Sequence, residues 1–302
     1  MEEFRFEITE VDEGDRIDKF LTENIDFVSR SYIQKIIKDG KVSVNDKIVK
    51  PSFVLKTDDQ IYFQLPDSIE PNIEAENLPL DIIYEDSDLI IINKPKNMVV
   101  HPANGHYSGT LVNALMYHCK NDLSGINGVL RPGIVHRIDK NTSGSLIVCK
   151  NDRSHQCIAE QLKEHSIKRI YHAIVHGKLY ENGTINKPIG RNPKDRMKMA
   201  VVPNGKEAIT HYTVLKTFED YTYISCQLET GRTHQIRVHM ASIGHPILGD
   251  DVYAVSKKSS YKCDGQTLHA KTIGFIHPTT QKYMEFDTPL PEYFQHFLKI
   301  MN

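Results

Sequence analysis

The sequence predicts an α+β protein: a mixed, mainly antiparallel central sheet with flanking helices and a central cleft, preceded by a small α+β domain. Short β-branched apolar runs predict the strands, and apolar residues at helical spacing predict the helices. Residues 66–80 are rich in Pro, Glu, Asn and Asp and lack periodicity, which indicates a linker. We therefore expect a small domain with the start of the linker over 1–70, linker over 71–80, and a larger domain over 81–302.

Composition indicates a globular, soluble chain. The 302 residues are 39% hydrophobic and 25% charged, and no run is long and apolar enough for a membrane helix. The N-terminal residues are acidic and lack the apolar region of a signal peptide. We therefore expect a cytoplasmic protein, monomeric and without a membrane partner.

Motifs for metals and cofactors are absent from the sequence. The five cysteines are scattered without a Cys-x-x-Cys pair, and the 15 histidines form no His-Glu-x-x-His. We accordingly expect no metal and no cofactor. The net charge is only −2, so a nucleic-acid partner would require locally clustered basic residues.

The small domain begins with helical patterns. Residues 15–21 carry apolar positions on one helix face, and a second helix is expected to start after Ser29 or Ser31 and to end at Asp39-Gly40. Alternating residues then predict strands at 42–44, 48–49 and 61–63, with a turn at 45–46.

Basic residues are concentrated in this small domain. Residues 30–56 hold seven Lys or Arg against two Asp, a local net of +5. Such a cluster is commonly a solvated face, but it also suits contacts with an RNA backbone. The candidate RNA-binding side chains are Arg30, Lys35, Lys38, Lys41 and Lys50.

The larger domain alternates strands and helices. An acidic turn separates the first two strands, Thr110 is a candidate N-cap, and a basic segment, 186–206, predicts a loop or loose hairpin suited to an RNA backbone. The expected strands are 82–84, 89–92, 145–149, 168–177, 210–215 and 221–228, and the expected helices are 110–119, 151–164 and one starting near 236.

The most informative stretch is 133–148. Arg131-Pro132-Gly133 is a turn signal followed by a short apolar piece, and residues 141–144 form a second turn before the strand at 145–149. Four ionisable residues, His136, Arg137, Asp139 and Lys140, lie between these turns. Asp139 is therefore either a plain turn residue bonded to its own backbone or a carboxylate positioned between two strands.

The string His136-Arg137-Ile138-Asp139, followed after two residues by Thr142-Ser143-Gly144, resembles the catalytic signature of the RluA/RluC/RluD-type pseudouridine synthases. Further segments match in order, and the small domain resembles the S4 RNA-binding domain, with Asp58-Asp59 where that domain usually has Gly-Asp. The matching segments of the larger domain are 93–102, 168–177, 229–240, 244–250, 268–270, 277–278 and 286–291.

The resemblance implies a pseudouridine synthase fold and the isomerisation of uridine to pseudouridine in RNA. It implies that Asp139 is the catalytic carboxylate, that Tyr171 packs on the base, and that Arg237 pairs with Asp139. Arg232 is the less favoured holder of that pairing role. Further substrate-binding candidates are His136, which orients the loop, Arg137, which fills the stack vacated by a flipped uridine, and Thr142, Arg232 and His234.

Alternatives to this interpretation concern both substrate and chemistry. Large-subunit ribosomal RNA is the favoured substrate at the level of the family, and transfer RNA is the alternative. From other classes of protein, a non-catalytic RNA-binding protein and a metal-dependent hydrolase using the histidines remain to be distinguished.

Overall fold

The computed structural model describes residues 2–10, 12–25, 30–65, 73–102, 107–120, 122–126, 131–195, 198–255, 259 and 261–301. The chain divides into two compact units, residues 1–72 and 73–302. Each unit is described by itself.

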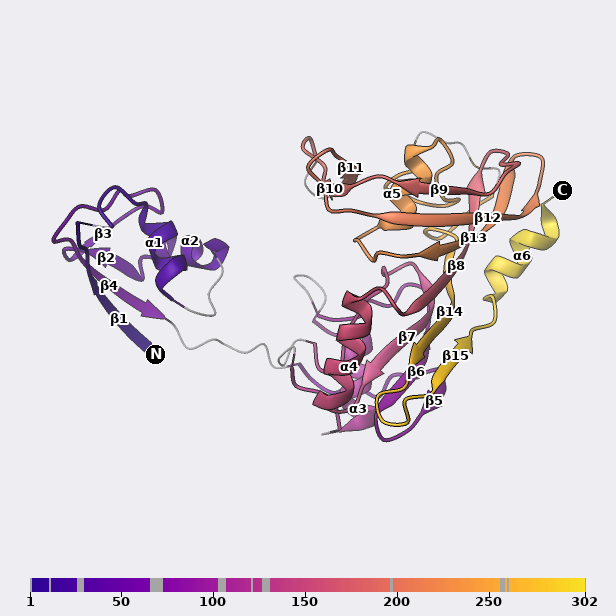
Figure 1. Cartoon of the computed structure of the whole chain (residues 1–302), viewed down its shortest axis with the longest axis horizontal. Coiled ribbons are helices and arrows are strands. Elements are labelled where there is room, and N and C mark those ends of the chain that lie inside the picture. Colours follow the sequence, from indigo (N-terminus) through magenta and orange to yellow (C-terminus); the bar gives the residue numbers. More distant parts are fainter. Residues whose placement is uncertain are drawn as a thin grey trace. The chain divides into compact units, whose positions relative to one another are not determined.

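The first unit is a small α+β domain (Figure 1). Its sheet has the strand order β1-β4-β2-β3, and Ile17, Leu21, Ile33 and Ile37 of the two helices lie with sheet residues such as Phe63 in one buried core. The elements are β1 (Glu2–Glu7), α1 (Ile17–Asn24), α2 (Arg30–Lys38), β2 (Val42–Val44), β3 (Lys47–Ile48) and β4 (Gln60–Leu65).

The start of α2 and the turn at Asp58 can be compared with the sequence predictions. Ser31 lies inside α2 and so is not its N-cap, and Ser29 lies outside the described residues. At the departure from the S4 pattern, Asp58 adopts the left-handed conformation, φ 67°, that the usual glycine would adopt more easily. The Asp59 carboxylate holds this turn by accepting hydrogen bonds from the Lys56 amide and the Asn45 side chain.

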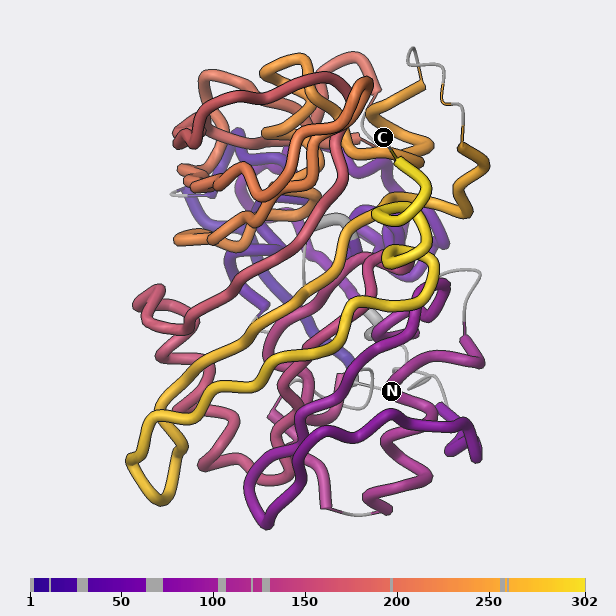
Figure 2. Tube along the Cα trace, turned by 90° about the vertical axis from the view of Figure 1, so that its right-hand side faces the viewer, coloured from indigo at the N-terminus to yellow at the C-terminus, as the bar shows by residue number. Residues whose placement is uncertain are grey.

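The second unit is built on a nine-stranded sheet (Figures 1 and 2). The strand order is β5-β6-β7-β14-β8-β13-β12-β9, with β15 paired to β14, and every pair is antiparallel except β7 with β14. The predicted mixed, mainly antiparallel sheet is confirmed. The strands are β5 (Ile82–Glu85), β6 (Leu89–Lys94), β7 (Ser143–Cys149), β8 (Lys168–His176), β9 (Gly183–Asn186), β12 (Ile209–Thr217), β13 (Tyr221–Leu228), β14 (Leu268–Ile276) and β15 (Tyr283–Asp287).

Helices cover both faces of this sheet, because its central strands are apolar on both sides. Alternate residues of β6 and β7 pack toward α3 (Leu111–Cys119) on one face and toward α4 (Asp152–Lys163) on the other. In the second half of the sheet, α5 (Gln235–Ser242) and α6 (Glu292–Ile300) pack in the same way on opposite faces. Tyr171 packs against both the α3 and the α5 clusters, so it marks the middle of the face that these two helices share.

Residues 73–80 belong to the second unit, which therefore begins eight residues before the start expected from the sequence. Ile73 is buried in the α3 core, and Asn113 of α3 donates a side-chain hydrogen bond to the Glu74 carbonyl. The segment packs against α3 without forming a helix or strand of its own. The predicted N-cap of α3 is confirmed, since the Thr110 side chain accepts from the Asn113 amide.

Two further expectations concern the piece after Gly133 and the basic segment 186–206. The apolar piece after Gly133 forms only one β-bridge, from Ile134 to Val148, so the alternative in which two strands flank Asp139 is not observed. The chain turns at 131–134, where the Ile134 amide donates to the Arg131 carbonyl. The basic segment 186–206 does contain a hairpin, with β10 (Ile189–Arg191) paired to β11 (Met199–Val201).

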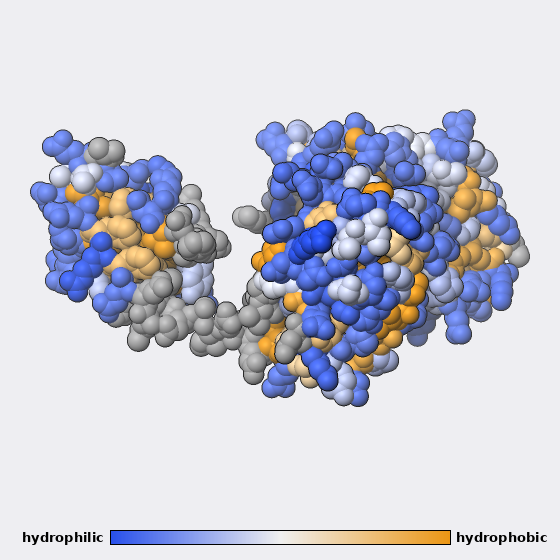
Figure 3. Space-filling model, turned by 60° about the horizontal axis from the view of Figure 1, so that its bottom comes forward, coloured by the Kyte–Doolittle hydropathy of each residue, from blue (hydrophilic) through white to orange (hydrophobic). Residues whose placement is uncertain are grey.

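Hydrophilic residues cover most of the face seen in Figure 3, and the hydrophobic patches on it are scattered. No helix within the described ranges combines the length and the apolar character needed to cross a bilayer.

Candidate active site

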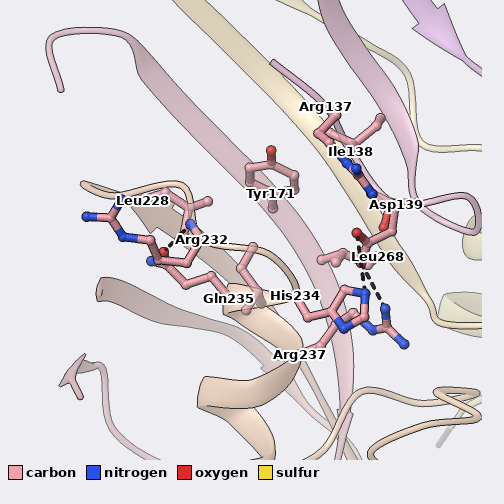
Figure 4. Close-up of a pocket in the computed structure, with 12 residues that line it drawn as sticks. Arg137, Ile138, Asp139, Tyr171, Leu228, Arg232, His234, Gln235, Arg237 and Leu268 are labelled. Atoms are coloured by element: carbon pink, nitrogen blue, oxygen red, sulfur yellow. Dashed lines mark hydrogen bonds and ion pairs between the residues drawn. The ribbon is translucent and has the colours of Figure 1, made fainter. Parts of the chain in front are cut away.

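A cleft opens on the α3 and α5 face of the large sheet, at its middle (Figure 4). Segments that lie far apart in the sequence form it: the loop before β7, strand β8, and α5 with the turn that precedes it, together with one residue each from β13 and β14. The lining residues are Arg137, Ile138, Asp139, Thr142, Tyr171, Leu228, Arg232, His234, Gln235, Ile236, Arg237 and Leu268.

The loop that carries Asp139 is fixed by its own backbone and by β7. The Thr142 amide donates to the Asp139 carbonyl at 3.0 Å, which closes a turn directly after the carboxylate. His136 turns away from the cleft, and its Nε2 accepts a hydrogen bond from the Ile147 amide at 3.0 Å. Burial, together with the charge of Arg169, lowers the pKa of His136 to about 3, so the ring is neutral and its role here is to anchor the loop.

Lys94 supports the same loop from beneath. Its Nζ is fully buried and donates to the carbonyl oxygens of Pro95, Met98 and Lys140 at 2.7, 2.8 and 3.1 Å. An ammonium group has three donors, which matches these three acceptors. Burial lowers the pKa of Lys94 to about 7, and the nearby Asp139 charge opposes this shift.

Gly144 allows the loop to enter the sheet beside β14. Its φ is +112°, and a Cβ at this position would lie 2.2 Å from the Ala270 carbonyl oxygen. Only glycine permits this close approach, which occurs at the parallel contact between β7 and β14. The Thr-Ser-Gly portion of the sequence signature therefore has a structural cause.

Asp139 is paired with Arg237, which projects from α5. Arg237 Nη1 donates to Asp139 Oδ2 at 2.9 Å. The Asp139 side chain is 20% exposed, whereas that of Arg237 is 5% exposed, so the carboxylate faces the cleft and the cation lies behind it. A guanidinium stays protonated across the physiological pH range, so a fixed positive charge stands beside the carboxylate.

Asp250 holds Arg237 from the other side. Arg237 Nε and Nη2 donate to its two carboxylate oxygens at 2.7 and 3.0 Å, a bidentate arrangement. Burial lowers the pKa of Arg237, but the hydrogen bonds and charges of Asp250 and Asp139 raise it by a larger amount. The pKa of Arg237 therefore lies above its ordinary value. Asp250 also accepts from the amides of Val252 and Tyr253, which satisfies this fully buried carboxylate.

His234 and Tyr253 complete the surroundings of the ion pair. His234 precedes α5 with φ 57°, an uncommon conformation for a residue with a side chain, and its Nε2 lies 3.9 Å from Asp139 Oδ1. Its Nδ1 is bonded to the Tyr253 hydroxyl at 2.8 Å, and the Tyr253 ring packs over the Arg237 guanidinium. Burial lowers the pKa of His234, and the Asp139 charge opposes this.

Tyr171 stands on β8 and presents its ring to the cleft, opposite Asp139 (Figure 4). Burial raises the pKa of its hydroxyl. Within the described part of the chain, that hydroxyl has no hydrogen-bond partner. A flat ring with a free hydroxyl suits contact with a nucleobase.

Arg232 does not pair with Asp139. Its Nε donates to the Glu207 carbonyl at 2.8 Å, and Figure 4 shows its guanidinium beyond Tyr171, on the side away from Asp139. Gln235 fixes this turn, since its Oε1 accepts from the Arg232 amide and the Thr230 hydroxyl. Thr142 lies at the floor of the cleft, where its hydroxyl accepts from Gln266 at 3.2 Å.

The remaining predicted site residues are Arg137 and the basic residues of the first unit. Arg137 is exposed at the edge of the cleft. Lys35, Lys38, Lys41 and Lys50 are exposed on the first unit, and the side chain of Arg30 lies outside the description.

One group in the described residues has the composition of a metal site: Asp86, Asp88 and His277. The amides of Thr279 and Thr280 donate to His277 Nδ1, so Nε2 carries the ring proton and donates it to Asp86 at 2.8 Å. A ring in this state offers no lone pair to a metal. The group therefore links the loop between β5 and β6 to the loop between β14 and β15, and none of its members lines the cleft.

Sequence reasoning missed Asp250, Lys94 and Tyr253. Asp250 and Lys94 lie in segments that had been matched to the family, 244–250 and 93–102, without a role being assigned to them. A buried carboxylate or ammonium group becomes recognisable only when its partners are known, and those partners are distant in the sequence.

Comparisons with known proteins identify the class. A model of the RNA pseudouridylate synthase family matches residues 88–242, and an S4 domain model matches residues 15–61. The chain therefore belongs to the RNA pseudouridylate synthase family, enzymes that isomerise uridine in RNA. The resemblance inferred from the sequence is confirmed.

Individual relatives refine this assignment. The chain is 51% identical over 285 residues to an uncharacterized RNA pseudouridine synthase, YlyB, of Bacillus subtilis, covering 94% of this chain and 93% of the relative. It is 45% identical over 304 residues to ribosomal large subunit pseudouridine synthase D of Zymomonas mobilis, covering 97% and 96%. Among solved structures, human RNA pseudouridylate synthase domain containing 1 superposes with a TM-score of 0.56 at 26% identity, covering 75% of this chain and 86% of that one.

Proposed function

We propose that this protein converts uridines of large-subunit ribosomal RNA to pseudouridine, with Asp139 as the catalytic carboxylate. The observation that carries the proposal is the Asp139 carboxylate, held by Arg237 in a cleft opposite the Tyr171 ring. The choice of RNA rests on relatives: those of Zymomonas mobilis and Pseudomonas aeruginosa, 45% and 40% identical, are named ribosomal large subunit pseudouridine synthase D.

The reaction needs a carboxylate and no external group donor. The bond between N1 of uracil and the anomeric carbon breaks, the base turns, and C5 bonds to that carbon. C5 then loses a proton and N1 gains one. Asp139 acts on this sequence as a nucleophile or as the stabiliser of an oxocarbenium-like sugar.

Arg237 supplies positioning and charge. Because Asp250 fixes two of its nitrogens, the third is aimed at Asp139 without freedom to rotate. A preorganised ion pair avoids reorganisation during the reaction. Tyr171 packs on the uracil while it turns, and its hydroxyl is available for proton transfer.

The target uridine must leave the RNA stack to enter the cleft, at a cost of roughly a few kcal/mol. Arg137 is exposed at the edge of the cleft, two residues before Asp139, where its guanidinium can occupy the vacated stack. His136 anchors the loop from behind and takes no chemical step.

The first unit extends the contact with RNA as an S4-type binding domain. Its exposed lysines, Lys35, Lys38, Lys41 and Lys50, suit phosphate contacts that are independent of sequence. A ribosomal RNA substrate also implies a cytoplasmic enzyme.

Mapping pseudouridines in RNA tests the proposal. Cells lacking the protein should lose specific pseudouridines of large-subunit ribosomal RNA, and the wild-type gene should restore them. Asp139→Asn should not restore them, although the purified variant should still bind the RNA. A loss confined to transfer RNA would reassign the substrate, and restoration by Asp139→Asn would remove Asp139 from the mechanism.

A further inference from the structure

Arg169 is a buried cation that the mechanism does not use. It lies on β8, two residues before Tyr171, so the two side chains project from the same face of the sheet. The residue is 8% exposed. Its Nη2 donates to the Glu229 carbonyl at 2.8 Å, and its Nε is buried without a partner.

A buried guanidinium normally has a carboxylate partner, because burial of an unpaired charge is unfavourable. No carboxylate among the described residues lies within ion-pair distance of Arg169. Glu229 is near in the sequence, but its carboxylate binds His211 at 2.6 Å, while only its carbonyl faces Arg169. The positive charge is therefore left uncompensated beside the cleft.

Gly231 lies against one end of this guanidinium. Gly231 is exposed, and a Cβ on it would lie 2.7 Å from Arg169 Nη1. Nη1 therefore lies directly against the exposed Gly231, where a side chain would cover or displace it. Arg232 follows directly and lines the cleft, and its guanidinium also lacks a carboxylate partner within the described residues.

We propose that Arg169 Nη1, which lies against the exposed Gly231, and the Arg232 guanidinium form a binding site for a phosphodiester group of the RNA strand that carries the target uridine. Two guanidinium groups suit phosphate oxygens by charge and by geometry. Two residues of a strand span about 6–7 Å, so the phosphate lies within about one nucleotide of a base packed on Tyr171. The inference rests on the proposed function and adds a contact that positions the strand.

Two variants test the site in the full-length protein. Arg169→Gln removes the charge, and Gly231→Ala keeps the charge but covers or displaces Nη1. Each should weaken binding to a large-subunit RNA fragment about tenfold, as expected for one charged hydrogen-bonded contact. The slope of log K against log salt should fall by about 0.7–0.9. The single-turnover rate at saturating RNA should change less than about threefold, since Asp139 and Arg237 remain in place.

Matched controls separate this role from a structural one. Arg153→Gln removes an exposed arginine of α4, and Gly125→Ala adds a methyl where nothing lies within 4 Å. Both should retain the wild-type affinity and salt slope. If Arg169→Gln fails to fold, Gly231→Ala alone decides.

An unchanged affinity and salt slope in Gly231→Ala would overturn the phosphate site, even if Arg169→Gln lowers the melting temperature. Pseudouridine formation by the wild-type protein would then still uphold the proposed function. Conversely, the wild-type protein could modify no RNA while the two variants show the predicted decrease in salt slope. That result would contradict the proposed function and still support the phosphate contact.

Discussion

Arg237 and Asp250 form a bidentate ion pair in the interior of the second unit, at 2.7 and 3.0 Å, and this pair leaves one nitrogen of the guanidinium for Asp139. Asp250 is fully buried and Asp139 faces the cleft. The two carboxylates therefore have different roles: Asp250 orients the Arg237 guanidinium, and Asp139 remains available to a substrate.

Replacement of Asp250 by alanine should therefore affect both stability and catalysis. The substitution leaves Arg237 buried with Asp139 as its one hydrogen-bonded carboxylate, and the expected loss is about 3–5 kcal/mol in the free energy of unfolding. Pseudouridine formation should fall sharply as Arg237 loses its orientation. Urea unfolding and a pseudouridine assay measure the two effects. Asp251→Ala is the matched control, because that side chain is 72% exposed and 3.9 Å from Arg237, and it should change stability by less than about 0.5 kcal/mol.

Arg237→Ala should be inactive and less stable, since it leaves the buried Asp250 unpaired. Arg232→Ala should fold normally, because Arg232 makes only a hydrogen bond to the Glu207 carbonyl. Thermal unfolding and single-turnover assays of both variants provide the comparison. A stable, active Arg237→Ala would show that the reaction does not depend on the ion pair.

The predictable part of this fold is the part encoded locally. Strand β7 and helices α3 and α4 follow from short-range patterns, including the cap at Thr110, because each pattern satisfies the backbone of its own segment. The unpredictable part depends on distant partners. Residues 73–80 have no periodicity of their own and are ordered by contact with α3, and the piece after Gly133 has too few partners to form a strand.

The same distinction applies to the site. The sequence motifs single out Asp139, Tyr171 and Arg237, and all three line one cleft. Whether Arg232 or Arg237 pairs with Asp139 depends on the direction of each side chain, which the packing of α5 and the contact with Glu207 determine. Asp250 and Lys94 could not be assigned, because a buried charge has no signature apart from its three-dimensional environment.

Tyr171→Phe separates packing from proton transfer. The hydroxyl makes no hydrogen bond within the described residues, so its removal should change the free energy of unfolding by less than about 1 kcal/mol. RNA affinity should persist because the ring remains. If the hydroxyl takes part in proton transfer, the single-turnover rate should fall about 10²-fold or more. A rate equal to that of the wild type would restrict Tyr171 to packing, and Tyr171→Leu would then be the variant that loses activity.

Acid should destabilise the protein in part through His136. Its pKa is about 3 in the fold, below the ordinary value near 6.5, so the unfolded chain binds a proton that the folded chain does not. Stability is therefore lost as pH falls from 6.5 toward 3, by up to about 1.4 kcal/mol per pH unit for this residue. His136→Gln should make the pH dependence shallower by that amount between pH 6 and 4, as measured by urea unfolding.

The stability of the wild type and of His136→Gln at pH 8 provides the reference for this test. At pH 8 the imidazole is neutral, and the glutamine side chain oxygen can accept from the Ile147 amide in its place, so the two proteins should differ by about 1 kcal/mol or less. An unchanged slope between pH 6 and 4 would show that His136 is protonated in the folded protein and that its hydrogen bond to β7 is not maintained.

Deletion of residues 1–72 should leave a catalytic unit that folds alone. The second unit keeps its own apolar clusters, and Ile73 remains to fill the α3 core. The truncated protein should bind RNA more weakly and with a smaller salt slope, because the lysines of the first unit are lost. In the full-length chain, joint replacement of Lys35, Lys38, Lys41 and Lys50 by glutamine should reduce the slope in the same direction.

Deletion of residues 1–80 is the informative contrast. It removes Ile73 and the hydrogen bond from Asn113 to Glu74, and so should lower the melting temperature of the catalytic unit, whereas deletion to 72 should not. Equal affinity and equal slope for the full-length and 1–72-deleted proteins would show that the first unit does not contact the RNA.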